Sequence, residues 1–116
     1  MLFGLFGKAV VRGLSMAPNL GYGDEVVIRY TDDIAVGDVI VFRRDRQNDI
    51  KRVESISEEG IFVVGDNPMS SLDSRNFGHI KPEQVVGKAI YRWKPKFGRI
   101  GNAHFDNPGE QLSPEE

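Results

Sequence analysis

The chain has 116 residues, a formal net charge of −2 and no cysteine. This length predicts one domain with a modest hydrophobic core. The small net charge provides no general attraction for nucleic acid, and the lack of cysteine excludes both a disulfide framework and a cysteine nucleophile.

The chain begins with an apolar segment, residues 1–11, which Lys8 interrupts. The segment is much shorter than the roughly 20 apolar residues that a membrane-spanning helix needs. It also lacks the basic region and the small-residue cleavage site of a secretory signal. We therefore expect a soluble, cytoplasmic protein. The alternative is a membrane-surface contact through the apolar side chains Leu2, Phe3, Leu5 and Phe6.

The rest of the chain is dominated by short runs of Val, Ile, Phe and Tyr between Gly, Asp and Asn turns, a pattern typical of β-strands. The predicted strands cover residues 24–30, 38–44, 49–57, 60–65 and 84–93. Glu58-Glu59-Gly60 is expected to be a hairpin turn. No segment shows a sustained helical period. The prediction is an all-β fold, a single small domain with a twisted, partly closed antiparallel sheet over residues 1–101. Residues 102–116 are expected to form a flexible tail.

Two residues in this pattern suggest catalysis. Ser15 lies in the turn-like segment Gly13-Leu14-Ser15-Met16-Ala17-Pro18, and Lys51 lies in a predicted strand among aliphatic residues. A serine hydroxyl needs a base to become a strong nucleophile, and a lysine is a base only when its amine is neutral. Burial among apolar side chains can provide this neutral form. Arg52 cannot replace Lys51, because a guanidinium stays charged.

A third segment, residues 65–78, reads Gly-Asp-Asn-Pro-Met-Ser-Ser-Leu-Asp-Ser-Arg-Asn-Phe-Gly. Together with residues 13–20, 37–42 and 51–53, in that order, it resembles the signal peptidase I family of serine endopeptidases (S24/S26 type). Within that family, the Gly-Asp-Asn-Pro variant is similar to the small soluble proteases that mature nickel superoxide dismutase. Larger relatives insert an extra β domain between the lysine and this segment, whereas here only 13 residues separate Lys51 from Gly65.

The resemblance implies a role for each matching residue. Ser15 would be the nucleophile and Lys51 the general base. Ser71 would help to align the lysine amine, and Asp73 and Arg75 would form a structural ion pair beside the site. Gly13 stands where some members carry a serine that contributes to the oxyanion hole, so backbone donors such as the Ser15 amide would hold the oxyanion.

We expect Met16 and Leu20, next to the nucleophile, to form shallow apolar pockets for the substrate. Such pockets would admit Ala, Gly or Ser before the scissile bond. His79 and His104 are expected to be structural, and no metal or cofactor is expected.

The predicted function is removal of an N-terminal leader or propeptide from a protein precursor, with the nickel superoxide dismutase propeptide as the leading substrate. No nucleic acid partner is expected. Three alternatives stay open: general signal peptide cleavage, a self-cleaving regulator similar to the SOS-response repressors, and a catalytically inactive β module that binds peptides along a strand edge.

Overall fold

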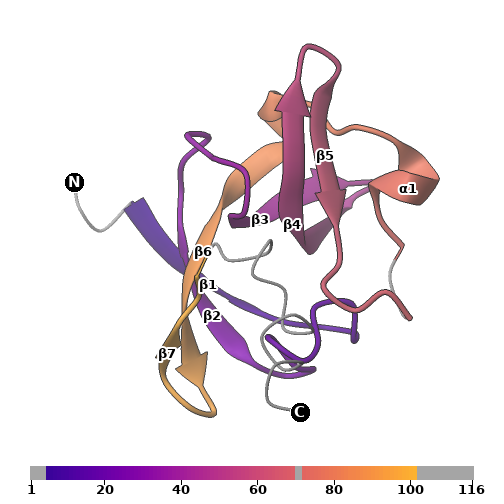
Figure 1. Cartoon of the computed structure of the whole chain (residues 1–116). Helices are drawn as coiled ribbons and strands as arrows, with labels where there is room; N and C mark the ends of the chain where they lie inside the picture. Colours follow the sequence, from indigo (N-terminus) through magenta and orange to yellow (C-terminus); the bar gives the residue numbers. More distant parts are fainter. Residues whose placement is uncertain (1–4, 70–71, 102–116) are drawn as a thin grey trace, which may run out of the picture.

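The computed structural model describes residues 5–69 and 72–101. These residues form one antiparallel sheet in the strand order β1-β2-β6-β3-β4-β5, with β7 paired to β6 (Figure 1). The strands are β1 (Phe6–Val10), β2 (Glu25–Arg29), β3 (Val39–Arg44), β4 (Gln47–Ser57), β5 (Gly60–Val64), β6 (Val85–Lys94) and β7 (Gly98–Arg99). A short helix, α1 (Ser74–Phe77), and a 3-10 turn, η2 (Pro82–Gln84), precede β6. The single small domain and the mostly antiparallel β architecture are as predicted. The predicted tail, residues 102–116, lies outside the described residues.

The five predicted strands correspond to β2 to β6, with differences of one or two residues at their ends. The structure adds β1, β7 and α1, which the sequence patterns did not predict. Strand β1 comes from the apolar N-terminal segment, and its side chains alternate between exposed and half-buried. It pairs antiparallel with β2 at one edge of the sheet, so the backbone groups on the side that faces β2 are hydrogen-bonded. No helix in the described part of the chain is long and apolar enough to cross a membrane.

Two tight hairpin turns connect β4 to its neighbours β3 and β5. Between β3 and β4, the turn residues Asp45 and Arg46 both have positive φ, 51° and 70°. Positive φ at both central positions is the geometry of a two-residue hairpin turn that matches the twist of the strands. Residues 58–59 form the turn between β4 and β5, which confirms the predicted hairpin.

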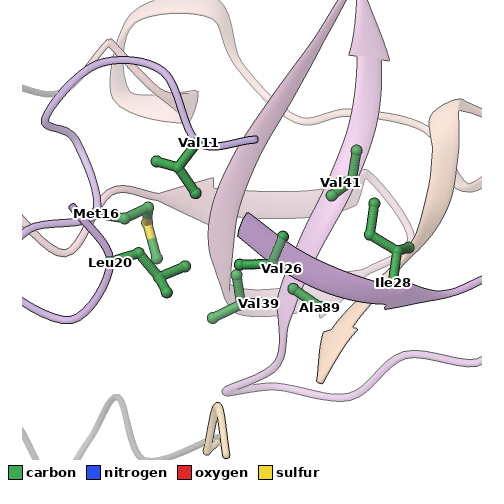
Figure 2. Close-up of a cluster of buried hydrophobic side chains, with 8 residues drawn as sticks. All are labelled: Val11, Met16, Leu20, Val26, Ile28, Val39, Val41 and Ala89. Atoms are coloured by element: carbon green, nitrogen blue, oxygen red, sulfur yellow. The ribbon is translucent and has the colours of Figure 1, made fainter. Parts of the chain in front are cut away.

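Strand β3 is buried on both faces, and successive side chains of a strand point to opposite faces. Val39 and Val41 enter one hydrophobic cluster, and Ile40 and Phe42 enter the other. Figure 2 shows the first cluster, in which side chains from the turn after β1 pack against strand residues. Its members are Val11, Met16, Leu20, Val26, Ile28, Val39, Val41 and Ala89. The second cluster contains Ile40, Phe42, Val53, Ile61, Val63 and Ile80.

Candidate active site

Ser15 lies in the turn that follows β1, where the chain leaves the edge of the sheet. The turn begins at Gly13, whose φ of 88° is in the left-handed region that favours glycine. Two internal backbone hydrogen bonds hold it, from Ala17 N to Leu14 O (3.1 Å) and from Leu20 N to Met16 O (2.9 Å). The segment is therefore an ordered turn that presents the serine at a defined position.

Lys51 lies in β4, and its Nζ is 2.9 Å from Ser15 Oγ, within hydrogen-bond distance. The lysine is 7% exposed. Burial lowers the pKa of the Lys51 amine from its ordinary value of 10.5, because a charged ammonium loses its hydration there. Asp49 and Asp73 act in the opposite direction and raise this pKa, whereas Arg44 lowers it further. The tertiary structure thus brings together a hydroxyl and an amine that are 36 residues apart in the chain.

A pocket of about 110 Å³ opens beside this pair. It is bounded on one side by residues 9–12, which run from the end of β1 toward Ser15, and on the other by residues 48–51 of β4. Val26 and Val41 also line it. A small space next to an aligned hydroxyl and amine suits a short side chain near the reacting carbonyl.

The loop after β5 ties the Ser15 turn to β4. Asn67 N donates to Ser15 O (2.8 Å), and Asn67 Nδ2 donates to Leu14 O (3.0 Å). Asp66 accepts from Arg52 Nε (3.0 Å) and Nη2 (2.7 Å), and also from Asn19 Nδ2 (2.7 Å). The sequence motifs did not predict this role for Asp66 and Asn67.

Arg52 is itself buried, at 4% exposed, and follows Lys51 directly. Besides Asp66, its Nη1 donates to Gly37 O (2.9 Å) and Gly101 O (2.7 Å). A charged side chain buried among aliphatic residues needs such partners. In the sequence, Arg52 is an arginine inside an apolar strand, and this pattern does not predict which residues it contacts.

Asp73 and Arg75 form the predicted ion pair, with two parallel hydrogen bonds of 2.9 and 2.6 Å. Asp73 is completely buried. It also accepts from Gly65 N (3.0 Å) and caps the first turn of α1 through Arg75 N (3.1 Å). The carboxylate therefore joins the end of β5 to α1. Ser71, the predicted helper of the lysine, lies outside the described residues.

The structure corrects the substrate-pocket prediction for Met16 and Leu20. These side chains are 0% and 2% exposed, and both belong to the first hydrophobic cluster (Figure 2). The short turn folds its apolar residues inward, because only there can they leave water. Neither residue lines the pocket beside Ser15.

A metal site in the described part of the chain would need several His, Asp or Glu side chains close together. No group of three or more His, Asp or Glu side chains is arranged there to bind a metal ion. His79 packs edge-on against Phe62 and lies 3.7 Å from Glu59. These contacts fit the structural role predicted for His79, whereas His104 lies outside the described residues.

Comparison with known proteins identifies the family. The family described as "Signal peptidase, peptidase S26" matches residues 1–56 and 50–94. Mitochondrial inner membrane protease subunit 1 of Schizosaccharomyces pombe is 30% identical over 118 positions, covering 78% of this chain and 75% of the relative.

Two further relatives match over 35 residues each, or 30% of this chain. Signal peptidase I of Bacillus caldolyticus is 57% identical over 19% of its own length. Thylakoidal processing peptidase 1 of Arabidopsis thaliana is 43% identical over 10% of its length. These two matches thus span less than a fifth of each relative, whereas the family match extends over most of this chain. The chain therefore belongs to the S26 signal peptidase family of proteases.

Proposed function

We propose that this chain is a serine endopeptidase in which Ser15 is the nucleophile and Lys51 is the general base. The observation that carries the proposal is the 2.9 Å contact between Lys51 Nζ and Ser15 Oγ at a buried lysine. Family membership supports peptidase chemistry in general, and this contact supports the assignment of the two groups.

The proposed reaction has two stages. In acylation, neutral Lys51 takes the Ser15 proton while Oγ attacks the substrate carbonyl. The Ser15 amide is the proposed oxyanion donor. As the peptide C–N bond breaks, the Lys51 ammonium returns its proton to the leaving amine. In deacylation, Lys51 takes a proton from water, the resulting hydroxide attacks the ester, and Ser15 recovers its proton.

The proposed substrate is a protein precursor with a removable N-terminal segment. The nickel superoxide dismutase propeptide remains the leading candidate, because residues 65–68 resemble the proteases that mature that enzyme. General signal peptide cleavage is the second candidate, and the relatives named as signal and processing peptidases favour it. Attachment to a membrane surface is compatible with either substrate.

The test of the proposal is to incubate the purified chain with both precursors and to identify the cut by mass spectrometry. We expect one precursor to be cut at a single site, and the Ser15→Ala variant to be inactive. If neither precursor is cut and a fluorophosphonate fails to label Ser15, the chain is an inactive peptide-binding module. If active chains cut the Ser15→Ala chain itself, it is a self-cleaving regulator.

The small pocket beside Ser15 also predicts specificity. With a space of about 110 Å³, Ala, Gly or Ser should be preferred before the scissile bond, and Phe or Trp should be excluded by size. A peptide series varied only at that position measures this, with kcat/KM for Phe expected to fall by about 100-fold or more. Equal cleavage after Phe and Ala would show that this pocket does not set the specificity.

A further inference from the structure

Asp49 lies two residues before Lys51 on β4. In the register with β3, Asp49 is opposite Phe42 and Lys51 is opposite Ile40. Side chains two residues apart on a strand share a face, about 6–7 Å apart along the chain. Asp49 and Lys51 also line the same pocket as Ser15. Asp49 therefore lies on the same face of β4 as Lys51 and lines the pocket beside the proposed proton transfer.

The Asp49 carboxylate is held in place. Arg44 Nε donates to Asp49 Oδ2 (2.8 Å), and Gln47 Nε2 donates to Asp49 Oδ1 (3.3 Å). The Asp49 side chain is 12% exposed. Arg44 lies over the Phe77 ring of α1, with 4.2 Å from Cζ to the ring centroid. The carboxylate thus has a defined position and is mostly shielded from water.

The proposed reaction forms a positive charge on Lys51 that a nearby carboxylate can stabilise. When Lys51 takes the Ser15 proton, an ammonium forms at a site that is 7% exposed. An ammonium away from water is costly unless an opposite charge lies nearby. Asp73 is a second carboxylate near Lys51, and it too accepts hydrogen bonds, from Arg75 and from the Gly65 amide. Of the two carboxylates, Asp49 raises the pKa of Lys51 more.

Two arginines also lie at this place. Arg44, from β3, opposes the Lys51 ammonium. Arg12 lines the far side of the pocket. Because Arg44 partly neutralises Asp49, the pair can stabilise the ammonium without holding Lys51 protonated at rest.

We propose that Asp49 is a positioning residue that balances the positive charge formed on Lys51 during catalysis, and that Arg44 limits this effect. The inference rests on the proposed serine–lysine mechanism. It predicts opposite changes for the two residues. Asp49→Asn should make Lys51 easier to deprotonate, and Arg44→Gln should make it harder.

The first measurement is the pH dependence of kcat/KM with one cleaved peptide. For Asp49→Asn, the acid limb should move to lower pH, and the plateau should fall by about three- to tenfold, because a weaker base takes the proton. For Arg44→Gln, the acid limb should move to higher pH. The control is Asp45→Asn, which removes an equal charge next to Arg44 at a side chain that is 84% exposed. Water screens that charge, so its profile should match the wild type.

The second measurement does not depend on cleavage. The six lysines are labelled with 13C at Cε, the Lys51 signal is assigned by its loss in Lys51→Met, and its titration is followed by NMR. The Lys51 pKa should fall in Asp49→Asn and rise in Arg44→Gln.

The outcomes separate this inference from the proposed function. If the variants titrate as expected but no peptide is cut, the proposed function fails and the electrostatic role stands. If peptides are cut and neither variant moves the Lys51 titration or the acid limb, Asp49 has only a structural role and the inference is overturned. If Asp49→Asn does not fold, Arg44→Gln still tests the inference. A shift of its acid limb and of the Lys51 titration to higher pH supports the inference, and no shift overturns it.

Discussion

At the residue scale, the proposed mechanism needs both the Ser15 hydroxyl and the Lys51 amine. Ser15→Ala and Lys51→Ala should each lower kcat by about 10³-fold or more, because each removes one partner of the proposed proton transfer. Lys51→Arg should not restore activity, since a guanidinium cannot act as a base at neutral pH. Peptide cleavage by the purified variants measures this, with circular dichroism to verify folding. Near wild-type turnover in Lys51→Ala would exclude the mechanism.

The buried lysine should also have a cost in stability. Its pKa is lower in the folded protein than the 10.5 of an exposed lysine, so the unfolded chain binds more protons between these two values. The free energy of unfolding should therefore rise with pH through that window and be reduced below it. Lys51→Met removes this cost and should stabilise the protein by about 1–2 kcal/mol at pH 7. Urea unfolding from pH 6 to 10 measures both effects, and a less stable Lys51→Met would contradict them.

At the element scale, the Arg52–Asp66 pair joins β4 to the loop that holds the Ser15 turn. Asp66→Asn should destabilise the fold by about 2–3 kcal/mol, because it leaves the buried Arg52 without its counter-charge. The Ser15 turn should then lose its fixed position, so kcat should fall as well. The separate variant Arg52→Lys should also lower both stability and kcat, since a lysine cannot make the same bidentate contact with Asp66.

Thermal unfolding and peptide cleavage, measured on the same samples, check this prediction. Glu59→Gln is the control, because Glu59 faces His79 at 3.7 Å with a side chain that is 79% exposed. Exposed pairs contribute little to stability. If Asp66→Asn and Glu59→Gln behaved alike, the connection between this loop and the Ser15 turn would have no energetic role.

At the scale of the whole molecule, the last described residues are attached to the core. Ile100 N donates to Ile90 O (2.8 Å), Ile100 packs against the first hydrophobic cluster, and Gly101 O accepts from Arg52. We therefore propose that residues 1–101 form the catalytic core and that its fold does not depend on residues 102–116. A chain ending at residue 101 should unfold within about 2 °C of the full chain and cleave peptides equally well.

A chain ending at residue 97 lacks β7, Ile100 and the Gly101 carbonyl, and it should be less stable by about 2–4 kcal/mol. Differential scanning calorimetry of the two truncated chains distinguishes them. Equal melting temperatures for both would show that the segment after β6 is dispensable.

Local patterns in the sequence predicted the strands from β2 to β6 and pointed to the two residues that meet at the site. Strand residues repeat with a local period, and the turns between them use Gly, Asp and Asn, so both signals lie within a few neighbouring positions. Ser15 and Lys51 were found because each lies in its own short motif. Strand β1 was not predicted, because its burial depends on pairing with β2, which comes 15 residues later in the chain.

The way in which these parts are joined depends on contacts between distant segments. The inward packing of Met16 and Leu20, and the bonds of Arg52 and Asn67 to distant segments, depend on which chain segments meet in space. Such contacts produce no periodic pattern in the sequence. The residues around a strand arginine are the same whether its side chain faces water or a buried carboxylate. The motifs thus indicated the two candidate groups, and the packing of segments far apart in the chain set their distance and the charge around them.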